Sequence, residues 1–307
     1  MGIWMEGKTL ANDIKQEIEK EVSDYREQGS ESPYLIGIQV GENKASQIYL
    51  KSKKRNCEKI GIKSDVLNFP ADIKPDHLKK EISRLNEKDD VDGILVQLPL
   101  PPAFNQNDVI MSLSPEKDVD GFHPINLGNL LLNQEGFKPC TPLGIIELLK
   151  SNKIGIEGKR VVIIGRSLIV GKPLAVMMTN ENGTVTICHS RTKNLSEVAS
   201  DADILVAAIG RTAFVNSEFV KEGATVVDVG INYLSDKAKM EQLFGKDEKR
   251  EKKLSKKGYT LVGDVHPDVI KKAEFLTPVP GGVGPLTIAM LMKNTLEAFK
   301  KRRGDKA

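Results

Sequence analysis

The stretch Val161-Val162-Ile163-Ile164-Gly165-Arg166-Ser167-Leu168-Ile169-Val170-Gly171-Lys172-Pro173 decides the fold of the C-terminal half of the chain. Its four apolar β-branched residues predict a buried strand, and the apolar residues after Gly171 predict a helix. A glycine turn between a strand and a helix lets the backbone approach a phosphate, at which the first N–H groups of the helix point. The segment therefore predicts a dinucleotide-binding turn. A tight turn without a ligand is the alternative, since Ser167 replaces the second glycine of the usual pattern.

The residues after the next predicted strand indicate which dinucleotide binds. A site for NAD carries an acid about 20 residues after the turn, where it binds the ribose 2′-hydroxyl. Here the strand 184–188 is followed by His189-Ser190-Arg191-Thr192, which has a hydroxyl and a guanidinium but no acid. Because a guanidinium suits a 2′-phosphate and Arg166 offers a second one, we expect NADP. A solvated arginine at the strand end is the alternative for Arg191.

Strands and helices alternate along the chain, which predicts an α/β fold with parallel sheets. The expected strands are 34–40, 66–69, 93–98, 161–164, 184–188, 204–208, 225–229, 260–262 and 275–276. The expected helices include 5–29, 46–60, 75–86, 143–151 and 286–302. Residues 114–142 are expected to be mostly loop, and the charged segment 235–257 is expected to be a solvated helix or surface excursion without a catalytic role.

Composition excludes several classes of protein. The 307 residues are 39% hydrophobic and 28% charged, which is typical of a globular chain with room for two domains. A net charge of +3 and 5% aromatic residues disfavour a nucleic-acid binder. The cysteines Cys57, Cys140 and Cys188 are odd in number and far apart, so neither a disulfide framework nor a metal site is expected. No apolar run approaches the roughly 20 residues of a membrane span, and no signal peptide precedes the first helix, so we expect a cytoplasmic protein.

One predicted helix carries a candidate acid–base group. Tyr49 and Lys53 are spaced i, i+4 and therefore share a face. Nearby Lys51, Lys54 and Arg55 are expected to lower the pKa of Lys53, which would let it move protons near neutral pH. A solvated lysine in a lysine-rich helix is the alternative.

Two further segments place polar groups where parallel sheets bind ligands. Gln97 interrupts an apolar strand just before a proline turn, at the carboxyl end where α/β sheets place their sites. A core amide with satisfied hydrogen bonds is the alternative for Gln97. Asp118 and Asp120 lie in the following loop, where turn formation explains them equally well.

These segments make the chain resemble the bifunctional methylenetetrahydrofolate dehydrogenase/methenyltetrahydrofolate cyclohydrolase family over almost its whole length. The matching pieces are Tyr49-x-x-x-Lys53, Val96-Gln97-Leu98-Pro99-Leu100-Pro101, Lys117-Asp118-Val119-Asp120-Gly121, Pro139-Cys140-Thr141-Pro142, the turn 165–173, and Pro278-Val279-Pro280-Gly281-Gly282-Val283-Gly284-Pro285. One departure is Leu286, where the family often has methionine.

The resemblance implies a role for each of these positions. Lys53 would be the catalytic lysine of the cyclohydrolase step, with Tyr49 beside it over the folate, Gln97 tuning it and Asp120 gripping the pterin ring. The expected dinucleotide contacts are Gly165, Arg166, Ser167, Ser190, Arg191 and Ile231. The expected substrate contacts are Tyr49, Gln97, Leu98, Asp120, Pro278, Gly281 and Gly282, and no metal is expected.

The resemblance also implies an architecture and an activity. A folate-binding catalytic domain would comprise 1–144, completed by 277–307 with the last helix, and a Rossmann-like NADP-binding domain would comprise 145–276. The enzyme would oxidise 5,10-methylenetetrahydrofolate with NADP⁺ and hydrolyse the methenyl product to 10-formyltetrahydrofolate, as part of one-carbon metabolism and purine biosynthesis. The alternatives are a monofunctional NADP-dependent dehydrogenase and a non-catalytic NADP-binding sensor.

The family is also expected to form homodimers through its cofactor domains. The sequence offers Phe214, Val215, Phe219 and Val220 as apolar surface candidates, with ordinary core as their alternative.

Overall fold

The computed structural model describes residues 2–303, and the last four residues of the predicted 277–307 segment lie outside this range. The chain forms two compact units, Met1–Leu10 with Thr141–Thr287, here the cofactor unit, and Ala11–Cys140 with Ile288–Ala307, here the lysine unit. These boundaries differ from the expected ones in residues 141–144 and 277–287, which lie in the cofactor unit, and, at the start of the chain, in the first ten residues. The reason for this last difference is the short strand β1 (Ile3–Trp4), which pairs with β11 (Phe275–Leu276) in the sheet of the cofactor unit.

The cofactor unit is built on a six-stranded sheet in which every pairing is parallel. The strand order is β1-β11-β8-β7-β5-β6, with β5 at Arg160–Ile164, β6 at Thr184–Cys188, β7 at Ile204–Ala207 and β8 at Thr225–Asp228. The helices α6 (Cys140–Ser151), α7 (Gly171–Asn180) and α8 (Leu195–Ala199) connect or precede these strands. The chain passes from β5 to β6 on one side and then returns to β7 on the other. This reversal at β5 is the place where doubly wound sheets bind ligands.

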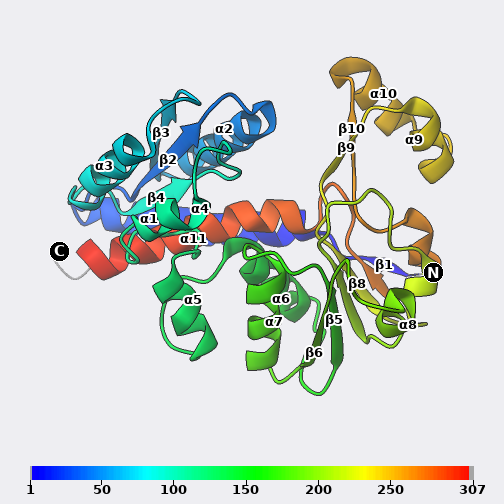
Figure 1. The fold of residues 1–307 in the computed structure, drawn as a ribbon. Helices are drawn as coiled ribbons and strands as arrows, with labels where there is room; N and C mark the ends of the chain where they lie inside the picture. The colour runs from blue at the N-terminus through cyan, green and yellow to red at the C-terminus, as the bar shows by residue number, and fades with distance from the viewer. Residues whose placement is uncertain (1, 304–307) are drawn as a thin grey trace. The chain divides into compact units, whose positions relative to one another are not determined.

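The charged segment forms a small lobe of its own within the cofactor unit. The antiparallel strands β9 (Asn232–Leu234) and β10 (Thr260–Val262) lead to and from α9 (Lys237–Phe244) and α10 (Glu248–Lys257). Figure 1 shows these helices standing away from the six-stranded sheet. A separate cluster of Leu234, Met240 and Val262 forms the core of the lobe. The prediction of helix in this segment is thereby confirmed.

The lysine unit contains a three-stranded parallel sheet in the order β3-β2-β4. Its strands are β2 (Tyr34–Val40), β3 (Lys63–Phe69) and β4 (Gly93–Val96), and its shorter helices are α2 (Lys44–Lys59), α3 (Pro75–Asn86) and α4 (Gln106–Met111). Two long helices, α1 (Gly7–Glu27) and α11 (Val283–Arg303), lie mostly in this unit. β4 ends one residue before Gln97, so the expected strand to residue 98 was two residues too long.

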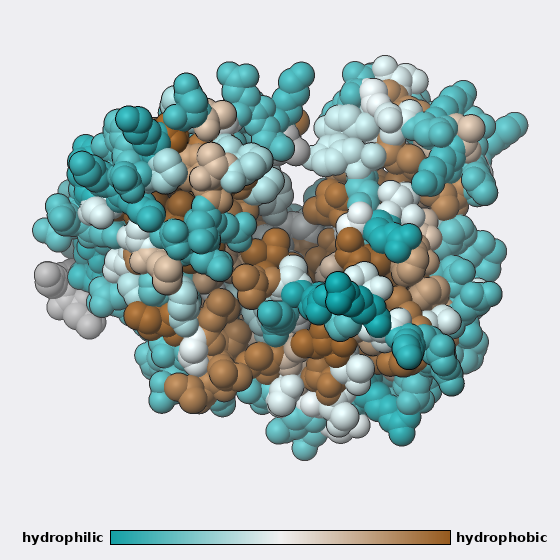
Figure 2. Space-filling view, in the orientation of Figure 1, coloured by the Kyte–Doolittle hydropathy of each residue, from teal (hydrophilic) through white to brown (hydrophobic). Residues whose placement is uncertain are grey.

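The predicted loop 114–142 contains a helix that the sequence did not indicate, α5 (Pro124–Leu131). It begins where the His123 ring nitrogen Nδ1 accepts from the N–H of Ile125. Its buried residues are Asn126 and Leu130, whereas Ile125 and Leu131 are 54% and 67% exposed, so the buried face of the helix is not an apolar stripe of helical period. Figure 2 shows hydrophobic side chains at the surface where α5 lies.

Most of the last helix, from Ile288 onward, belongs to the lysine unit. Asn294 donates from Nδ2 to the carbonyls of Val119 and Lys138, at 2.8 and 3.1 Å. Near the end of the helix, the Phe299 ring meets the Tyr25 ring edge-on at 5.2 Å. The apolar face of α11 is therefore buried against α1 and the loop before α6.

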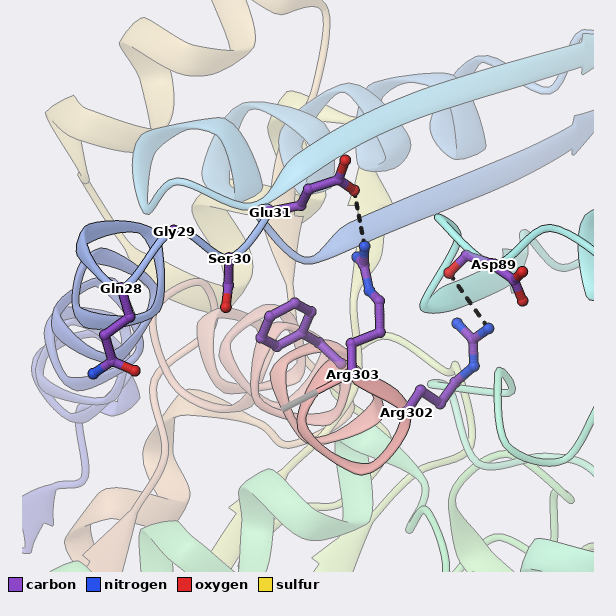
Figure 3. Close-up of a pocket in the computed structure, with 8 residues that line it drawn as sticks. Gln28, Gly29, Ser30, Glu31, Asp89, Arg302 and Arg303 are labelled. Atoms are coloured by element: carbon purple, nitrogen blue, oxygen red, sulfur yellow. Dashed lines mark hydrogen bonds and ion pairs between the residues drawn. The ribbon is translucent and has the colours of Figure 1, made fainter. Parts of the chain in front are cut away.

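Two arginines fix the C-terminal end of α11. Arg303 pairs with the fully buried carboxylate of Asp92, and Arg302 contacts the same carboxylate at 3.3 Å. Figure 3 shows the two guanidinium groups diverging, Arg303 toward Glu31 and Arg302 toward the backbone of Asp89. A buried carboxylate needs such partners, because an unpaired charge in the interior is costly.

In the part of the chain that the structure describes, no helix is both long and apolar enough to cross a membrane.

Candidate active site and dinucleotide site

Lys53 is buried in the lysine unit, with 5% of its surface exposed. It lies one turn after Tyr49 on α2, and its ammonium is 4.9 Å from the centre of the Tyr49 ring. Its Nζ donates to Oε1 of Gln97 at 3.4 Å. Lysine is rarely buried unless its charge has partners, so Lys53 is not the solvated lysine that the sequence left open.

Gln97 presents its amide oxygen to Lys53 because its other groups are occupied. Its backbone N–H donates to the carbonyl of Ile38 at 2.9 Å, which ties the residue to the end of the sheet. Its side-chain Nε2 donates to the carbonyl of Leu98 at 2.8 Å. The remaining acceptor, Oε1, therefore faces the ammonium. The partly exposed Leu98 follows directly beside it.

The two acids of the following loop have different surroundings. Asp118 accepts from the N–H of His123 at 2.7 Å and from Nδ2 of Asn126 at 2.9 Å, so it organises the loop, and burial raises its pKa to about 6. Burial also raises the pKa of Asp120, while the charge of Lys53 and a hydrogen bond from Cys140 act against burial. Asp120 thus joins the Lys53 cluster, and Asp118 supports the loop that carries it.

Cys140 is a member of this cluster to which the sequence analysis gave no role, although it lies in a segment that matches the family. It is 2% exposed, and Sγ donates to the carbonyl of Val119 at 3.4 Å. Burial raises its pKa well above the ordinary value, so it stays a neutral thiol that donates a hydrogen bond beside Asp120. The signal was present in Pro139-Cys140-Thr141-Pro142, but the spacing did not reveal its neighbour.

The predicted dinucleotide turn lies at the carboxyl end of β5. Two of its positions, Gly165 and Gly171, have room only for glycine. Gly165 has φ +130°, and a Cβ there would lie 2.2 Å from the carbonyl oxygen of Ala208. A Cβ on Gly171 would lie 2.1 Å from the carbonyl oxygen of Gly165. The backbone therefore folds back tightly on itself, with the start of α7 directly behind the turn.

Ser167 has a structural reason to replace the second glycine. Its Oγ accepts from the N–H groups of Val170 and Gly171, at 3.2 and 3.3 Å, as a capping side chain does at the start of a helix. The hydroxyl thus satisfies the N–H of Val170, the residue before α7, and the first N–H of α7, and Ser167 remains exposed.

The cations expected beside the dinucleotide lie at the ends of neighbouring strands. The N–H of Gly165 donates to the carbonyl of Cys188 at 2.9 Å, which ties the turn to the end of β6. Arg166 precedes Ser167 in this turn, and Ser190 with Arg191 forms the turn after β6; all are exposed. Ile231, 47% exposed, follows the carboxyl end of β8. These residues share one edge of one sheet, and no acid occupies the position typical of an NAD site.

Two buried acids shape this edge and were missed in the sequence. Asp264 accepts from the N–H groups of Ile209, Gly210 and Arg211 at 2.7–2.9 Å, which fixes the loop after β7. Asp228 in turn accepts from the N–H of Asp264 at 2.8 Å. Aspartates at strand ends are common turn residues, so nothing in the sequence distinguished these two.

The segment Pro278–Gly282 forms a closed turn in the cofactor unit. The N–H of Gly282 donates to the carbonyl of Pro278 at 2.8 Å, and Gly281 has φ +117°. The first N–H groups of α1, from Gly7 and Lys8, donate to the carbonyl of Gly281 at 3.0 and 3.2 Å. The start of a helix therefore holds this loop, in addition to the strand before it.

Family models match both parts of the chain. Residues 5–120 match the catalytic domain of tetrahydrofolate dehydrogenase/cyclohydrolase, and residues 139–303 match the NAD(P)-binding domain of the same enzymes. The chain belongs to the tetrahydrofolate dehydrogenase/cyclohydrolase family.

Individual members of the tetrahydrofolate dehydrogenase/cyclohydrolase family match along the whole chain. The bifunctional protein FolD of Koribacter versatilis is 49% identical over 301 residues, which cover 98% of each sequence. The crystal structure of the bifunctional enzyme FolD from Campylobacter jejuni is 44% identical and superposes with a TM-score of 0.88, covering 98% of this chain and all of the other. A Trypanosoma brucei FolD, solved with an NADP cofactor and an inhibitor, is 36% identical with a TM-score of 0.88, covering 100% and 99%.

These matches confirm several predictions. The family, the α/β two-domain fold and the assignment as an NADP-dependent dehydrogenase and cyclohydrolase are all confirmed. The roles of individual residues stay predictions that rest on the geometry above.

The apolar residues considered for an interface prove to be core. Val215 and Val220 are fully buried, and Phe214 and Phe219 pack against the same cluster. They are therefore not surface candidates for dimer formation.

Proposed function

We propose that Lys53 is the proton carrier of the cyclohydrolase step in this bifunctional folate enzyme. The observation that carries the proposal is the burial of the Lys53 ammonium between Gln97, Asp120 and the Tyr49 ring. A buried amine with one amide acceptor and one acid nearby is held in place and shielded from water. Such a group can deliver and remove a proton at a fixed position.

The reaction proceeds in two steps, of which only the second needs this group. In the first step a bound NADP⁺ would supply the acceptor for the hydride that the methylene carbon of 5,10-methylenetetrahydrofolate loses as it becomes the methenyl carbon. Water then adds to that carbon and loses a proton, and a folate ring nitrogen gains a proton as its bond to the carbon breaks. The product is 10-formyltetrahydrofolate. Lys53 carries the proton in this second step, while Asp120 binds the pterin and Tyr49 lies over the ring.

The turn Gly165–Gly171 fits the dinucleotide. Because Gly165 and Gly171 have no side chains, the backbone of the turn can come close to a ligand. The N-terminus of α7 points toward the same place, where its N–H groups favour a phosphate. Arg166 and Arg191 offer exposed guanidinium groups for a 2′-phosphate. Ser190, which precedes Arg191 in the turn after β6, offers a hydroxyl. We assign the preference for NADP over NAD to these residues, and the remaining contact to Ile231.

The second candidate function, a dehydrogenase that has lost the cyclohydrolase, lacks support in the geometry. Such an enzyme has no need for a buried lysine with its own amide acceptor. One assay separates the candidates: absorbance with 5,10-methylenetetrahydrofolate and NADP⁺, followed through methenyl formation and decay. Enzyme-dependent decay is expected; accumulation of methenyl product without accelerated decay would leave only the dehydrogenase, and no signal would leave an NADP-binding protein.

We also propose a homodimer joined through the cofactor units, with β6 at the interface. Among the described strands β6 pairs only with β5, so its other side is an open edge. The N–H of Thr184 donates to Lys159, and the carbonyl of Cys188 accepts from Gly165, so these residues point their backbone groups inward. Ile187, 38% exposed, therefore points its N–H and carbonyl outward, where a second copy of β6 can pair.

The remaining proposals concern cellular context. With no membrane span among the described helices, we propose a cytoplasmic enzyme. Its place is one-carbon metabolism, where 10-formyltetrahydrofolate serves purine biosynthesis.

A further inference from the structure

Arg250, on α10 of the charged lobe, differs from the charged residues around it because its guanidinium is largely buried. Its side chain is 16% exposed. Nη1 donates to the carbonyl of Leu261 at 2.5 Å, and Nη2 donates to the carbonyl of Val279 at 3.0 Å. Nε lies 3.3 Å from Asp247, and the guanidinium stacks 3.8 Å from the centre of the Phe244 ring. All faces of the group are thus engaged, so its position is fixed by several contacts at once.

The bond to Val279 reaches the middle of the loop Pro278–Gly282. The start of this loop is held by Thr277, whose Oγ1 accepts from the N–H of Asp228 at 2.7 Å. Its end is held by α1 at the Gly281 carbonyl. Between Thr277 and Gly281, the side chain of Arg250 donates to the backbone carbonyl of Val279. Arg250 belongs to α10 and not to the six-stranded sheet.

The loop also borders a cavity at this point. Pro278, Val279 and Pro280 border a cavity of about 280 Å³ together with Arg250. Pro278 and Val279 are only half-buried and Pro280 is exposed, so single hydrogen bonds contribute much of the order of this segment. The link between Arg250 and Val279 is therefore placed where the loop most needs support.

We propose that Arg250 is a positioning residue for the folate-binding loop Pro278–Gly282, and that the charged lobe serves to deliver it. This inference rests on the proposed folate activity and on the substrate contacts of Pro278, Gly281 and Gly282 that the family resemblance implies. The fork of the guanidinium bridges two carbonyls on different segments, β10 and the loop, which the single ammonium of a lysine does only in part.

The test combines hydrogen exchange with kinetics on Arg250→Met, Arg250→Lys and the control Lys252→Met, an exposed charge on the same helix. In Arg250→Met, the peptide 277–283 should exchange about tenfold faster, the scale of losing one hydrogen bond to a charged group, while the β5 peptide stays unchanged. The KM for the folate substrate should rise about tenfold, with the KM for NADP⁺ unchanged. Arg250→Lys should fall between Arg250→Met and the parent, and Lys252→Met should match the parent.

Two results would overturn the role of Arg250. One is unchanged exchange of the 277–283 peptide in Arg250→Met. The other is an equal rise in both KM values, which indicates general disruption rather than a shifted loop. If the parent protein lacked folate turnover, the proposed function would fail on that ground, and the exchange measurement would still decide whether Arg250 holds the loop.

Discussion

A buried ammonium is stable only where neighbours replace the water that it has lost, and Lys53 meets this condition with one amide oxygen, one acid and one aromatic ring. Lys53→Met keeps the volume and removes the proton carrier. Cyclohydrolase turnover should fall by about 10²–10⁴-fold, as for other acid–base groups, whereas hydride transfer should fall far less. Rates of methenyl decay measure the first effect and NADPH formation the second.

The control is Lys51→Met, because Lys51 is exposed on the same helix. It should leave both rates unchanged, and thermal unfolding should show that both variants fold. Full cyclohydrolase activity in Lys53→Met would contradict the assignment.

We expect Arg166 and Arg191, at the carboxyl edge of the sheet in the cofactor unit, to decide the choice of cofactor. Replacing either with glutamine should raise the KM for NADP⁺ about tenfold, the scale of one charge-assisted hydrogen bond, and change the KM for NAD⁺ little, because NAD⁺ has no 2′-phosphate. Arg160→Gln is the matched control, since Arg160 lies at the opposite end of β5, paired with Asp201. Preference of the parent enzyme for NAD⁺ would show that these arginines do not read the phosphate.

At the scale of single elements, the C-terminal end of α3 contacts the buried ammonium of Lys117, which lies in the loop that carries Asp120. Lys117, 2% exposed, donates from Nζ to the carbonyls of Leu85, Asn86 and Lys88 at 2.6–3.1 Å. These carbonyls close the C-terminal end of the helix, where a positive charge is favourable. Lys117→Met should lower the free energy of unfolding by about 2 kcal/mol in urea titrations at neutral pH, whereas the exposed Lys88→Met should change it little.

The same lysine predicts a pH dependence. Burial lowers the pKa of Lys117 from 10.5 to about 8. Between these values the unfolded chain holds a proton that the folded chain has released, so the free energy of unfolding rises with pH in this window. The difference between the parent and Lys117→Met should therefore grow between pH 8 and pH 10. A constant difference would mean that Lys117 stays charged in the folded state.

Elements with a periodic apolar pattern could be predicted from the sequence. Two elements, β1 and α5, could not, and each failure has a physical reason. The predicted strands 184–188 and 260–262 and the helix 75–86 have the observed bounds. β1 was missed because two exposed residues form it through pairing with β11, far along the chain. α5 was missed because its buried residues, Asn126 and Leu130, do not form an apolar stripe, whereas Ile125 and Leu131 are exposed. In the site, local motifs indicated Lys53 and Gln97, while Cys140 and Asp264 act through neighbours distant in sequence.

At the scale of the whole molecule, the open edge of β6 makes assembly testable by mass. Light scattering at micromolar concentration should give about twice the chain mass of 33.8 kDa. Ile187→Lys places a charge at the proposed seam and should yield monomers, because edge lysines block strand pairing. Ile125→Lys, on α5 of the other unit and also exposed, should leave the mass unchanged. A monomeric parent that still turns over folate would show that assembly is dispensable.

The interleaved course of the chain also constrains how the protein is made. The sheet of the cofactor unit takes β1 from the first residues and β11 from residues 275–276, and the lysine unit takes the last turns of α11. Domains commonly fold one after another as they leave the ribosome. Here neither unit can reach its final contacts until nearly all of this chain has been synthesised. In particular, β1 cannot pair until residues 275–276 of β11 have been synthesised. The nascent chain should therefore acquire protease resistance late and for both units together, rather than in two separate stages.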